Sequence, residues 1–479
     1  MFDKINEECG IFGIYSKDGI DVAGETYLAL YALQHRGQES CGIAVNDDGI
    51  INYHKDTGLV PEVFDKNTLE SLGKGQMAIG HVRYATTGNT NAVNAQPIVS
   101  RYIKGNLALA HNGNLVNAYE LRERFMKNGG IFQTTNDSEI IMYTIAQERN
   151  GAGSIEEAIN RSMKILKGAY SIVVMSPKKL IAARDPHGFR PLCMGQLGDT
   201  YVFASESCAL DTLGAKFIKD VEPGEIVVVD DKGVRYIRDN CQKKSNMCVF
   251  EFVYFARPDS VIEGNSVHFA RQEAGRFLAR EHKVEADLVC GVPDSGLDAA
   301  MGYAAESGIP YGLAFIKNRY IGRTFIQPTQ NARERAVKIK LNALSSSVKG
   351  KRIVLIDDSI VRGTTVAQII KLLRDAGAKE VHIRISSPPF LYPCYFGTDI
   401  DSRDKLIANH FTKDEICRQI GADSLGYLSI EALTKIAPNK NCDYCVGCFT
   451  GKYPVEVPEE MTKDRFESKI SKNCAGKKI

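Results

Sequence analysis

Hydrophobic and polar positions follow two different patterns along the 479 residues of the chain, one in each half. In the first half, apolar runs rich in glycine and aromatic residues predict strands, among them CGIFGIY at 9–15, YSIVVM at 170–175 and TYVFAS at 200–205. Two helical stretches lie between them, near Ala23–Gln34 and Ser138–Glu148. This layout predicts sheets that are covered by helices.

The second half alternates strands and helices. ADLVCG at 286–291 predicts a buried strand, PDSG a turn, and Leu297–Glu306 a helix. KRIVLI at 351–356 predicts another strand, and the helix after it carries one apolar face, formed by Val366, Ile369, Ile370 and Leu373. Two strand–loop–helix units predict an open parallel sheet, whose ligands bind at the carboxyl ends of the strands.

Composition and charge narrow the class of function. Hydrophobic residues make up 44% of the chain and charged residues 25%, as in a soluble globular protein. The net charge is only +2, so no general basic field is present to hold a nucleic acid, and a small-molecule role is favoured. The N-terminus has no signal-peptide run and the chain has no apolar stretch long enough for a membrane span, so we expect a cytoplasmic protein.

The segment VLIDDSIVRGTT at 354–365 carries the most chemical information. Asp357 and Asp358, at a strand end, could hold a ribose diol or a hydrated magnesium ion. Small and hydroxyl residues then run into a helix N-terminus, where free backbone N–H groups favour a phosphate. The alternative is a simple helix-capping turn, but the strand, the acidic pair and the threonine-rich loop occur together.

This segment resembles the binding signature of the type I phosphoribosyltransferases. The resemblance implies that phosphoribosyl diphosphate is bound by Asp357, Asp358, Ser359, Arg362, Gly363, Thr364 and Thr365. It assigns magnesium to Asp357, Asp358 and Ser295, the last from the turn VPDSG. The basic stretch Lys317–Lys340 is either a solvated surface or a loop that folds over the diphosphate.

Cys9 begins a glycine-rich strand after only eight residues. If residues 1–8 were removed, its α-amine, with a reference pKa of about 8, could act as the base for its own thiol. Its companions resemble those of the class II glutamine amidotransferases. That resemblance implies that Arg83 clamps the α-carboxylate of glutamine, that Asp137 meets the α-ammonium group, and that Asn112 and Gly113 form an oxyanion hole.

Other residues of this half are expected to be structural. With an N-terminal amine as base, His35, His81 and His111 are interpreted as hydrogen-bonding scaffold, and Cys41 as a small buried residue. The segment LQHRGQES at 33–40 fits the same amidotransferase pattern and is assigned to architecture and to support of the substrate loop.

The chain has thirteen cysteines, and three of them, Cys442, Cys445 and Cys448, form a C-x₂-C-x₂-C run. Two upstream cysteines, Cys248 and Cys394, could close a four-thiolate site. Such a set suits zinc or an iron–sulfur cluster, and spacing alone does not choose between them or exclude metal-free buried thiols.

From Cys9 to about Pro454 the motifs together resemble the glutamine-dependent phosphoribosyl-diphosphate amidotransferases, in particular their iron–sulfur, propeptide-processed branch. The implied fold is an N-terminal nucleophile hydrolase αββα sandwich followed by an α/β phosphoribosyltransferase domain with an open parallel sheet. The expected divisions are a propeptide at 1–8, a glutaminase domain at 9–240 and a phosphoribosyltransferase domain with a cluster-binding segment at 241–479. The polar stretch 239–247 marks the boundary.

The same resemblance implies the chemistry. Ammonia released at Cys9 would pass internally to magnesium-bound phosphoribosyl diphosphate, giving 5-phosphoribosylamine for purine biosynthesis in a homotetramer inhibited by purine nucleotides. A 4Fe–4S cluster would be held by Cys248, Cys394, Cys445 and Cys448, with Cys442 able to replace Cys445. The alternatives are another class II amidotransferase, which Asp357–Thr365 argues against, and a non-enzymatic sensor of phosphoribosyl diphosphate, which would not need Cys9.

Overall fold

The computed structural model describes residues 9–17, 19–84, 91–242, 244–318, 341–400, 402–438 and 442–458. The expected propeptide at 1–8 and all but the first two residues of the basic stretch Lys317–Lys340 lie outside the described residues.

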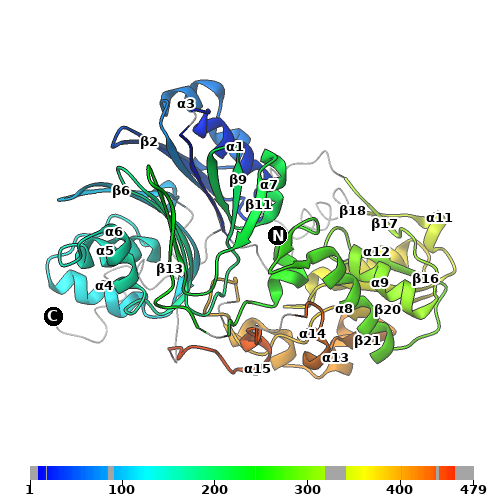
Figure 1. Ribbon diagram of the computed structural model, residues 1–479. Helices are drawn as coiled ribbons and strands as arrows, with labels where there is room; N and C mark the ends of the chain where they lie inside the picture. The colour runs from blue at the N-terminus through cyan, green and yellow to red at the C-terminus, as the bar shows by residue number, and fades with distance from the viewer. Residues whose placement is uncertain are drawn as a thin grey trace.

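Two antiparallel sheets form the first half (Figure 1). The first has the order β11-β9-β10-β1-β4-β2-β3. Its strands are β1 (Gly10–Tyr15), β2 (Ser40–Asp47), β3 (Ile50–Thr57), β4 (Met77–Arg83), β9 (Cys193–Leu197), β10 (Thr200–Ala204) and β11 (Lys216–Asp220). The second has the order β13-β12-β8-β7-β6-β5. Its strands are β5 (Ile98–Tyr102), β6 (Gly105–Leu115), β7 (Gly168–Met175), β8 (Leu180–Arg184), β12 (Ile226–Asp230) and β13 (Gly233–Ile237).

Helices cover the outer face of each sheet, which gives four layers. The first sheet is covered by α1 (Val22–Ala32), α2 (Val60–Val63), α3 (Lys66–Ser71) and α7 (Ser207–Leu213). The second is covered by α4 (Ala118–Lys127), α5 (Asp137–Glu148) and α6 (Ile155–Ser162), and the short helix η1 (Ala92–Asn94) precedes β5. Strand alternation divides the core, since Ile11 packs between the sheets while Phe12 and Ile14 pack under α1.

The second half is built on a parallel sheet with the order β16-β19-β20-β21. These strands are β16 (Leu288–Gly291), β19 (Arg352–Asp357), β20 (Glu380–Ile385) and β21 (Ser424–Tyr427). On one face Val354 and Ile356 pack against α8 (Val267–Glu281) and α9 (Leu297–Ser307). On the other, Ile353 and Leu355 pack against α12 (Thr364–Asp375) and α13 (Lys413–Ile420).

Smaller elements connect the two halves and border the parallel sheet. They are the hairpins β14 (Val261–Ile262)–β15 (Asn265–Ser266) and β17 (Phe315–Lys317)–β18 (Leu341–Ala343), the π-helix η2 (Glu251–Phe255), the turns η3 (Arg403–Lys405) and η4 (Ile407–Asn409), and the helices α11 (Ser345–Val348), α14 (Ile430–Leu433) and α15 (Gly447–Thr450).

Of the two helices of the α8–α9 pair, the sequence pattern predicts only α9. The two helices approach closely because each contributes a glycine to the contact. A side-chain carbon at Gly275 would lie 1.8 Å from the carbonyl oxygen of Ala299, and one at Gly302 would lie 1.9 Å from that of Gln272. Small residues replace the large apolar stripe that would mark a helix such as α8 in the sequence.

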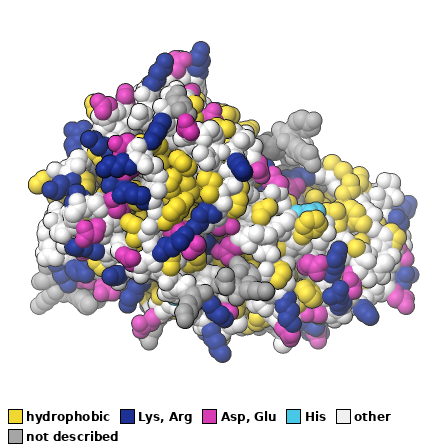
Figure 2. All heavy atoms as spheres, in the orientation of Figure 1, with side chains coloured by type: hydrophobic (Ala, Val, Ile, Leu, Met, Phe, Trp, Pro, Cys, Tyr) yellow, Lys and Arg dark blue, Asp and Glu magenta, His cyan; other side chains and the backbone are white. Residues whose placement is uncertain are grey.

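The visible face of the molecule mixes charges of both signs. Figure 2 shows Lys and Arg side chains interspersed with Asp and Glu over the whole face, with no continuous basic area. In the part of the chain that the structure describes, none of the helices combines the length and the apolar character needed to cross a membrane.

Candidate active sites

Cys9 immediately precedes β1, at the point where the start of β1 lies beside the end of β4. Gly10 pairs with Val82, so Cys9 is next to Arg83 at the end of β4. Both are buried, with exposed fractions of 6% and 2%. The thiol of Cys9 donates a hydrogen bond to the carbonyl oxygen of Tyr84 at 3.4 Å. The structure therefore brings the expected nucleophile and the expected carboxylate clamp together.

Asn112 and Gly113 lie near the end of β6, which contacts β1 and β4 from the opposite sheet. The side-chain Nδ2 of Asn112 is buried and has no hydrogen-bond partner among the described residues. A buried donor without a partner is costly unless a ligand uses it. Gly113 has φ of +141°, and a side-chain carbon there would lie 2.2 Å from the carbonyl oxygen of Ala169, so glycine is required.

Asp137 opens α5 beneath this strand end and is 3% exposed. Its Oδ2 accepts a hydrogen bond from the backbone N–H of Leu115 at 2.9 Å, which fixes the carboxylate beside the Asn112–Gly113 segment. The five residues expected to bind and cleave glutamine thus come from three strand ends and one helix N-terminus.

His81 and His111 both make buried hydrogen bonds, which agrees with the scaffold role expected for them, and the contact of His81 joins the two sheets. His81 Nε2 lies 3.0 Å from the carbonyl oxygen of His111, and His111 Nδ1 lies 3.0 Å from Ser138 Oγ. Burial lowers the pKa of His81 to about 3, and burial also lowers that of His111 although Asp137 opposes the shift. Both rings are therefore neutral near pH 7. Cys41 is fully buried, as expected.

A second site lies where β16 and β19 end. The two strands are parallel neighbours with Gly291 opposite Ile356, so the loops that follow them lie side by side. Ser295 Oγ donates to Asp358 Oδ1 at 2.5 Å, and Ser359 Oγ donates to Asp358 Oδ2. Asp357 and Asp358 are 2% and 1% exposed. The three residues expected to hold magnesium are thus in one place.

The phosphate-binding part of this site starts α12. Gly363 is the N-cap residue, with φ of +84°, a conformation that glycine adopts readily. Thr364 and Thr365 form the first turn, and Arg362 and Thr364 are exposed. Free N–H groups and hydroxyls at a helix N-terminus suit a phosphate. Lys317, at the end of β17, forms an ion pair with Asp294 of the neighbouring loop.

One small cavity, whose lining residues all belong to the second half, is lined by four cysteines, namely Cys248, Cys394, Cys445 and Cys448. Burial raises the pKa of the Cys448 thiol, and the neighbouring thiols of Cys394, Cys248 and Cys445 raise it further. Cys442 pairs with Ser245 and does not line this cavity. Within the described ranges, no group of three or more His, Cys, Asp or Glu side chains stands in a metal-holding arrangement.

Comparison with known proteins identifies the two halves. Residues 81–212 match the model of a glutamine amidotransferase domain, and residues 270–386 that of a phosphoribosyl transferase domain. The amidophosphoribosyltransferase of Bacillus subtilis is 48% identical over 461 residues, which cover 95% of this chain and 96% of the relative. That of Methanocaldococcus jannaschii is 49% identical over 95% of this chain and 100% of its own length. The chain belongs to the amidophosphoribosyltransferase family.

Solved structures of amidophosphoribosyltransferases agree with this assignment. The glutamine phosphoribosylpyrophosphate amidotransferase of B. subtilis, solved with ADP and GMP, superposes with a TM-score of 0.88 at 47% identity and covers 96% of this chain and 100% of its own. A structure described as the allosteric regulatory enzyme of purine biosynthesis gives 0.89 at 47% identity, covering 97% of this chain and 100% of its own.

The expected fold is confirmed as an N-terminal nucleophile hydrolase sandwich joined to a phosphoribosyltransferase sheet. As an amidophosphoribosyltransferase, the chain is an enzyme of the first step of purine biosynthesis, which transfers glutamine nitrogen to phosphoribosyl diphosphate. Its phosphoribosyltransferase domain implies magnesium in general.

One group of residues near the first site was not found from the sequence. Arg36, Arg190, Glu206 and Glu251 are charged side chains without solvent exposure that lie between the two halves. The only sequence signal was Arg36 within LQHRGQES, which was assigned to architecture. The two carboxylate partners of Arg36, Glu206 and Glu251, are 170 and 215 residues away in the chain, so no local pattern could reveal them.

Proposed function

We propose that Cys9 is the nucleophile that releases ammonia from glutamine. Once residues 1–8 are removed, its own α-amine takes the thiol proton and the thiolate attacks the side-chain amide carbon. A glutamyl thioester forms, ammonia leaves, and water then releases glutamate and regenerates the thiol. The buried, adjacent positions of Cys9 and Arg83 support these roles of nucleophile and α-carboxylate clamp.

The observation that carries this assignment is the unused donor of Asn112. With the backbone N–H of Gly113, its Nδ2 would stabilise the oxyanion that forms when the thiolate adds to the amide. Asp137 would accept hydrogen bonds from the α-ammonium group of glutamine, and its orientation by Leu115 supports that role.

At the second site, the loop after β19 would hold phosphoribosyl diphosphate. Thr364, Thr365 and the N–H groups of the first turn of α12 would bind the 5-phosphate, together with Ser359, Arg362 and Gly363. Asp357, Asp358 and Ser295 would hold magnesium, which supplies charge neutralisation for the departing diphosphate. Ammonia then adds to C1 as diphosphate leaves, giving 5-phosphoribosylamine.

The cavity cysteines Cys248, Cys394, Cys445 and Cys448 would hold a 4Fe–4S cluster. Their donor set suits such a cluster, and their convergence on one cavity supports this choice of four and favours Cys445 over Cys442. Amide transfer moves no electrons, so the cluster would act as a structural clamp between the C-terminal segment and the rest of the chain.

The remaining assignments concern the organisation of the protein. The first domain would span 9–240 and the second 241–479. The strands of the two antiparallel sheets all end before Arg238, which agrees with this boundary. Purine nucleotides would inhibit, as ADP and GMP in the B. subtilis structure suggest. We also propose that the enzyme is a cytoplasmic homotetramer.

Intact mass and N-terminal sequencing of anaerobically purified protein test these assignments together. We expect a mature chain that starts at Cys9 and carries about four irons and four sulfides. A preparation that retains residues 1–8 and yet uses glutamine at full rate would contradict the role of the Cys9 amine. Active protein without iron would contradict the cluster.

A further inference from the structure

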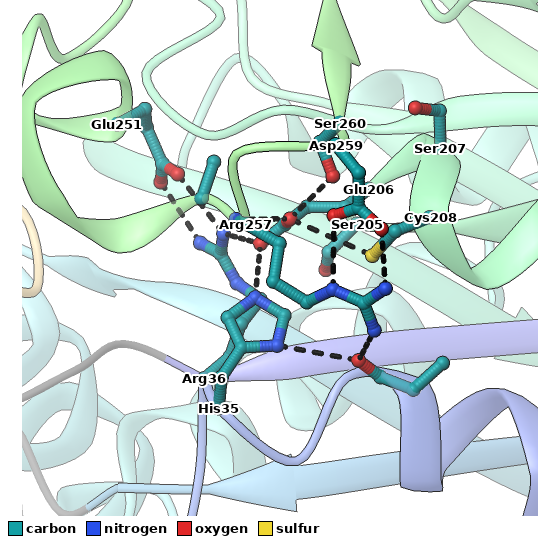
Figure 3. A network of polar contacts seen from close by, with 12 residues as sticks. His35, Arg36, Ser205, Glu206, Ser207, Cys208, Glu251, Arg257, Asp259 and Ser260 are labelled. Carbon is teal, nitrogen blue, oxygen red and sulfur yellow. Dashed lines mark hydrogen bonds and ion pairs between the residues drawn. The ribbon is translucent and has the colours of Figure 1, made fainter. Parts of the chain in front are cut away.

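A buried network of charges links the first half of the chain to the π-helix η2 of the second (Figure 3). Its centre is Arg36, in the connection between α1 and β2, with Glu206 and Glu251 on either side. All three side chains have no exposure to solvent. Burial works to raise the pKa of Glu206, but His35 and Arg36 hold it well below its usual value, so this carboxylate is ionised.

Arg36 contacts the expected nucleophile directly. Its Nε donates to the carbonyl oxygen of Cys9 at 3.0 Å. Its two terminal nitrogens form a fork on Glu251, with distances of 3.0 Å to Oε2 and 2.9 Å to Oε1. One of them also donates to Glu206 Oε1 at 2.5 Å. A planar guanidinium held on both carboxylates has one orientation, and that orientation fixes the main chain at Cys9.

Glu251 also contacts a second arginine, Arg190, which bonds a loop beside the expected oxyanion hole. Its Oε1 lies 3.3 Å from a terminal nitrogen of Arg190. Arg190 in turn donates two hydrogen bonds to the carbonyl oxygen of Phe396, at 3.2 and 2.7 Å. One carboxylate of the second half therefore orients two arginines, one that bonds the main chain of Cys9 and one that bonds the main chain of Phe396.

The loop around Phe396 packs against β6, the strand that carries Asn112 and Gly113. The side-chain Nδ2 of Asn114 donates to the carbonyl oxygen of Tyr395 at 2.9 Å. Gly397 has φ of +119°, and a side-chain carbon there would lie 3.4 Å from the carbonyl carbon of Gly113. The backbone that Arg190 holds is thus packed against the residue expected to supply the oxyanion N–H.

We propose that Glu251 is a positioning residue for the glutaminase reaction. Through Arg36 it fixes the main chain of Cys9, and through Arg190 it fixes the loop that supports Gly113. The inference rests on the proposed roles of Cys9, Asn112 and Gly113, and it adds that a residue of the second half sets their geometry. Glutamine cleavage then requires both halves to be docked, and addition of free ammonia to phosphoribosyl diphosphate does not require this network.

A purely structural role is the alternative, since buried ion pairs often join domains without improving stability or catalysis. The two roles predict different readouts. Loss of a domain clamp would weaken both reactions and lower the amount of folded protein. Loss of a positioning residue would lower kcat for glutamine and leave ammonia-dependent synthesis in place.

The test compares Glu251→Gln with Glu225→Gln in the full-length, processed enzyme. Glu225 is a matched control because it is also unexposed and contacts two cations, Lys219 and Arg238, but belongs to no part of the site. For Glu251→Gln we expect kcat for glutamine hydrolysis to fall about 10²-fold, because small displacements of reacting groups have effects of that size. Its KM for glutamine and its ammonia-dependent rate should stay within about twofold of wild type.

Two results would overturn the inference. One is a kcat for glutamine in Glu251→Gln equal to that of Glu225→Gln. The other is an equal loss of the glutamine and ammonia activities. If Glu251→Gln does not accumulate as folded protein, Arg36→Lys decides in the same assay, because lysine keeps the charge and removes the fork. It should lower kcat for glutamine by a similar factor, and full activity would refute the proposal.

Cys9→Ser, assayed in the same series, separates this inference from the proposed function. If Cys9→Ser still cleaves glutamine, the nucleophile assignment fails. If Cys9→Ser is inactive with glutamine and Glu251→Gln is fully active, only the positioning role fails.

Discussion

The two sites of this amidophosphoribosyltransferase are built in opposite ways. The proposed glutamine site would collect Cys9, Arg83, Asn112 and Asp137 from distant parts of the chain, and none of these side chains is more than 6% exposed. The proposed phosphoribosyl site would take most of its residues from one continuous segment, 357–365, and part of that segment is exposed. A buried site protects a thiolate and an oxyanion from water, whereas an anion as large as a sugar diphosphate needs an open strand end.

The largest expected effect separates the two sites completely. Cys9→Ser should lower glutamine-dependent synthesis at least about 10⁴-fold, because the nucleophile of a covalent mechanism is lost. Ammonia-dependent synthesis should remain, since the second site is untouched. Parallel assays of diphosphate release with glutamine and with ammonium chloride measure this. Loss of both activities would show that the sites are not independent.

The reverse experiment comes next in size. Asp357→Ala combined with Asp358→Ala should lower synthesis from either nitrogen source by about 10³-fold, because the ligands for magnesium are gone. Slow glutamine hydrolysis should persist, measured as glutamate formed without phosphoribosyl diphosphate. Synthesis at the normal rate in this double variant would refute the magnesium assignment.

Some features of these two sites could be predicted from the sequence, and others could not. The segment 357–365 could be proposed as a binding site from adjacent residues, because strand, acidic pair and phosphate turn follow one another in the chain. The glutamine residues were named only through a family resemblance, and the structure was needed to bring Cys9 beside Arg83. The network around Glu251 was missed, since its contacts join residues far apart in the sequence. Helix α8 was missed because small residues form much of its buried face, so the sequence has no stripe of large apolar side chains there.

A smaller change tests the oxyanion hole alone. Asn112→Ala should lower kcat for glutamine about 10²-fold with little change in KM, because the lost donor acts on the transition state. Asn240→Ala is a suitable control, since its side-chain Nδ2 bonds Asn160 and Met163, which are not residues of the proposed site. An unchanged kcat in Asn112→Ala would mean that another group stabilises the oxyanion.

The cavity cysteines of the second half offer a further test. Cys448→Ser should lower bound iron about 10-fold or more, because a ligand of the proposed cluster is lost. Cys442→Ser, its neighbour in the C-x₂-C-x₂-C run but outside the cavity, should keep its iron. Iron and sulfide analysis of anaerobic preparations distinguishes the two. Equal iron in both variants would contradict the proposed ligand set.

The smallest effect concerns pH. Burial lowers the pKa of His81 in the folded protein to about 3, below its ordinary value of 6.5. Because the unfolded chain takes up a proton at this residue more readily, the free energy of unfolding decreases as the pH falls from 6.5 toward 3. Above pH 6.5 the full stability is present. Between pH 7 and 5.5 we expect the first half to lose about 1 kcal/mol from this group. Hydrogen exchange of the β4 and β6 amides measures the loss. In His81→Gln it should shrink, and an unchanged pH dependence would show that His81 is not its source.

The central claim is that nitrogen freed at Cys9 is used at the Asp357–Thr365 site of the same enzyme. The most direct measurement gives the processed enzyme glutamine labelled with ¹⁵N in its side-chain amide, together with phosphoribosyl diphosphate and unlabelled ammonium ions. The isotope content of the trapped phosphoribosylamine is then determined by mass spectrometry. We predict that the amine carries the glutamine label well above its share of the total nitrogen. An isotope ratio equal to that of the free ammonium pool would contradict the account.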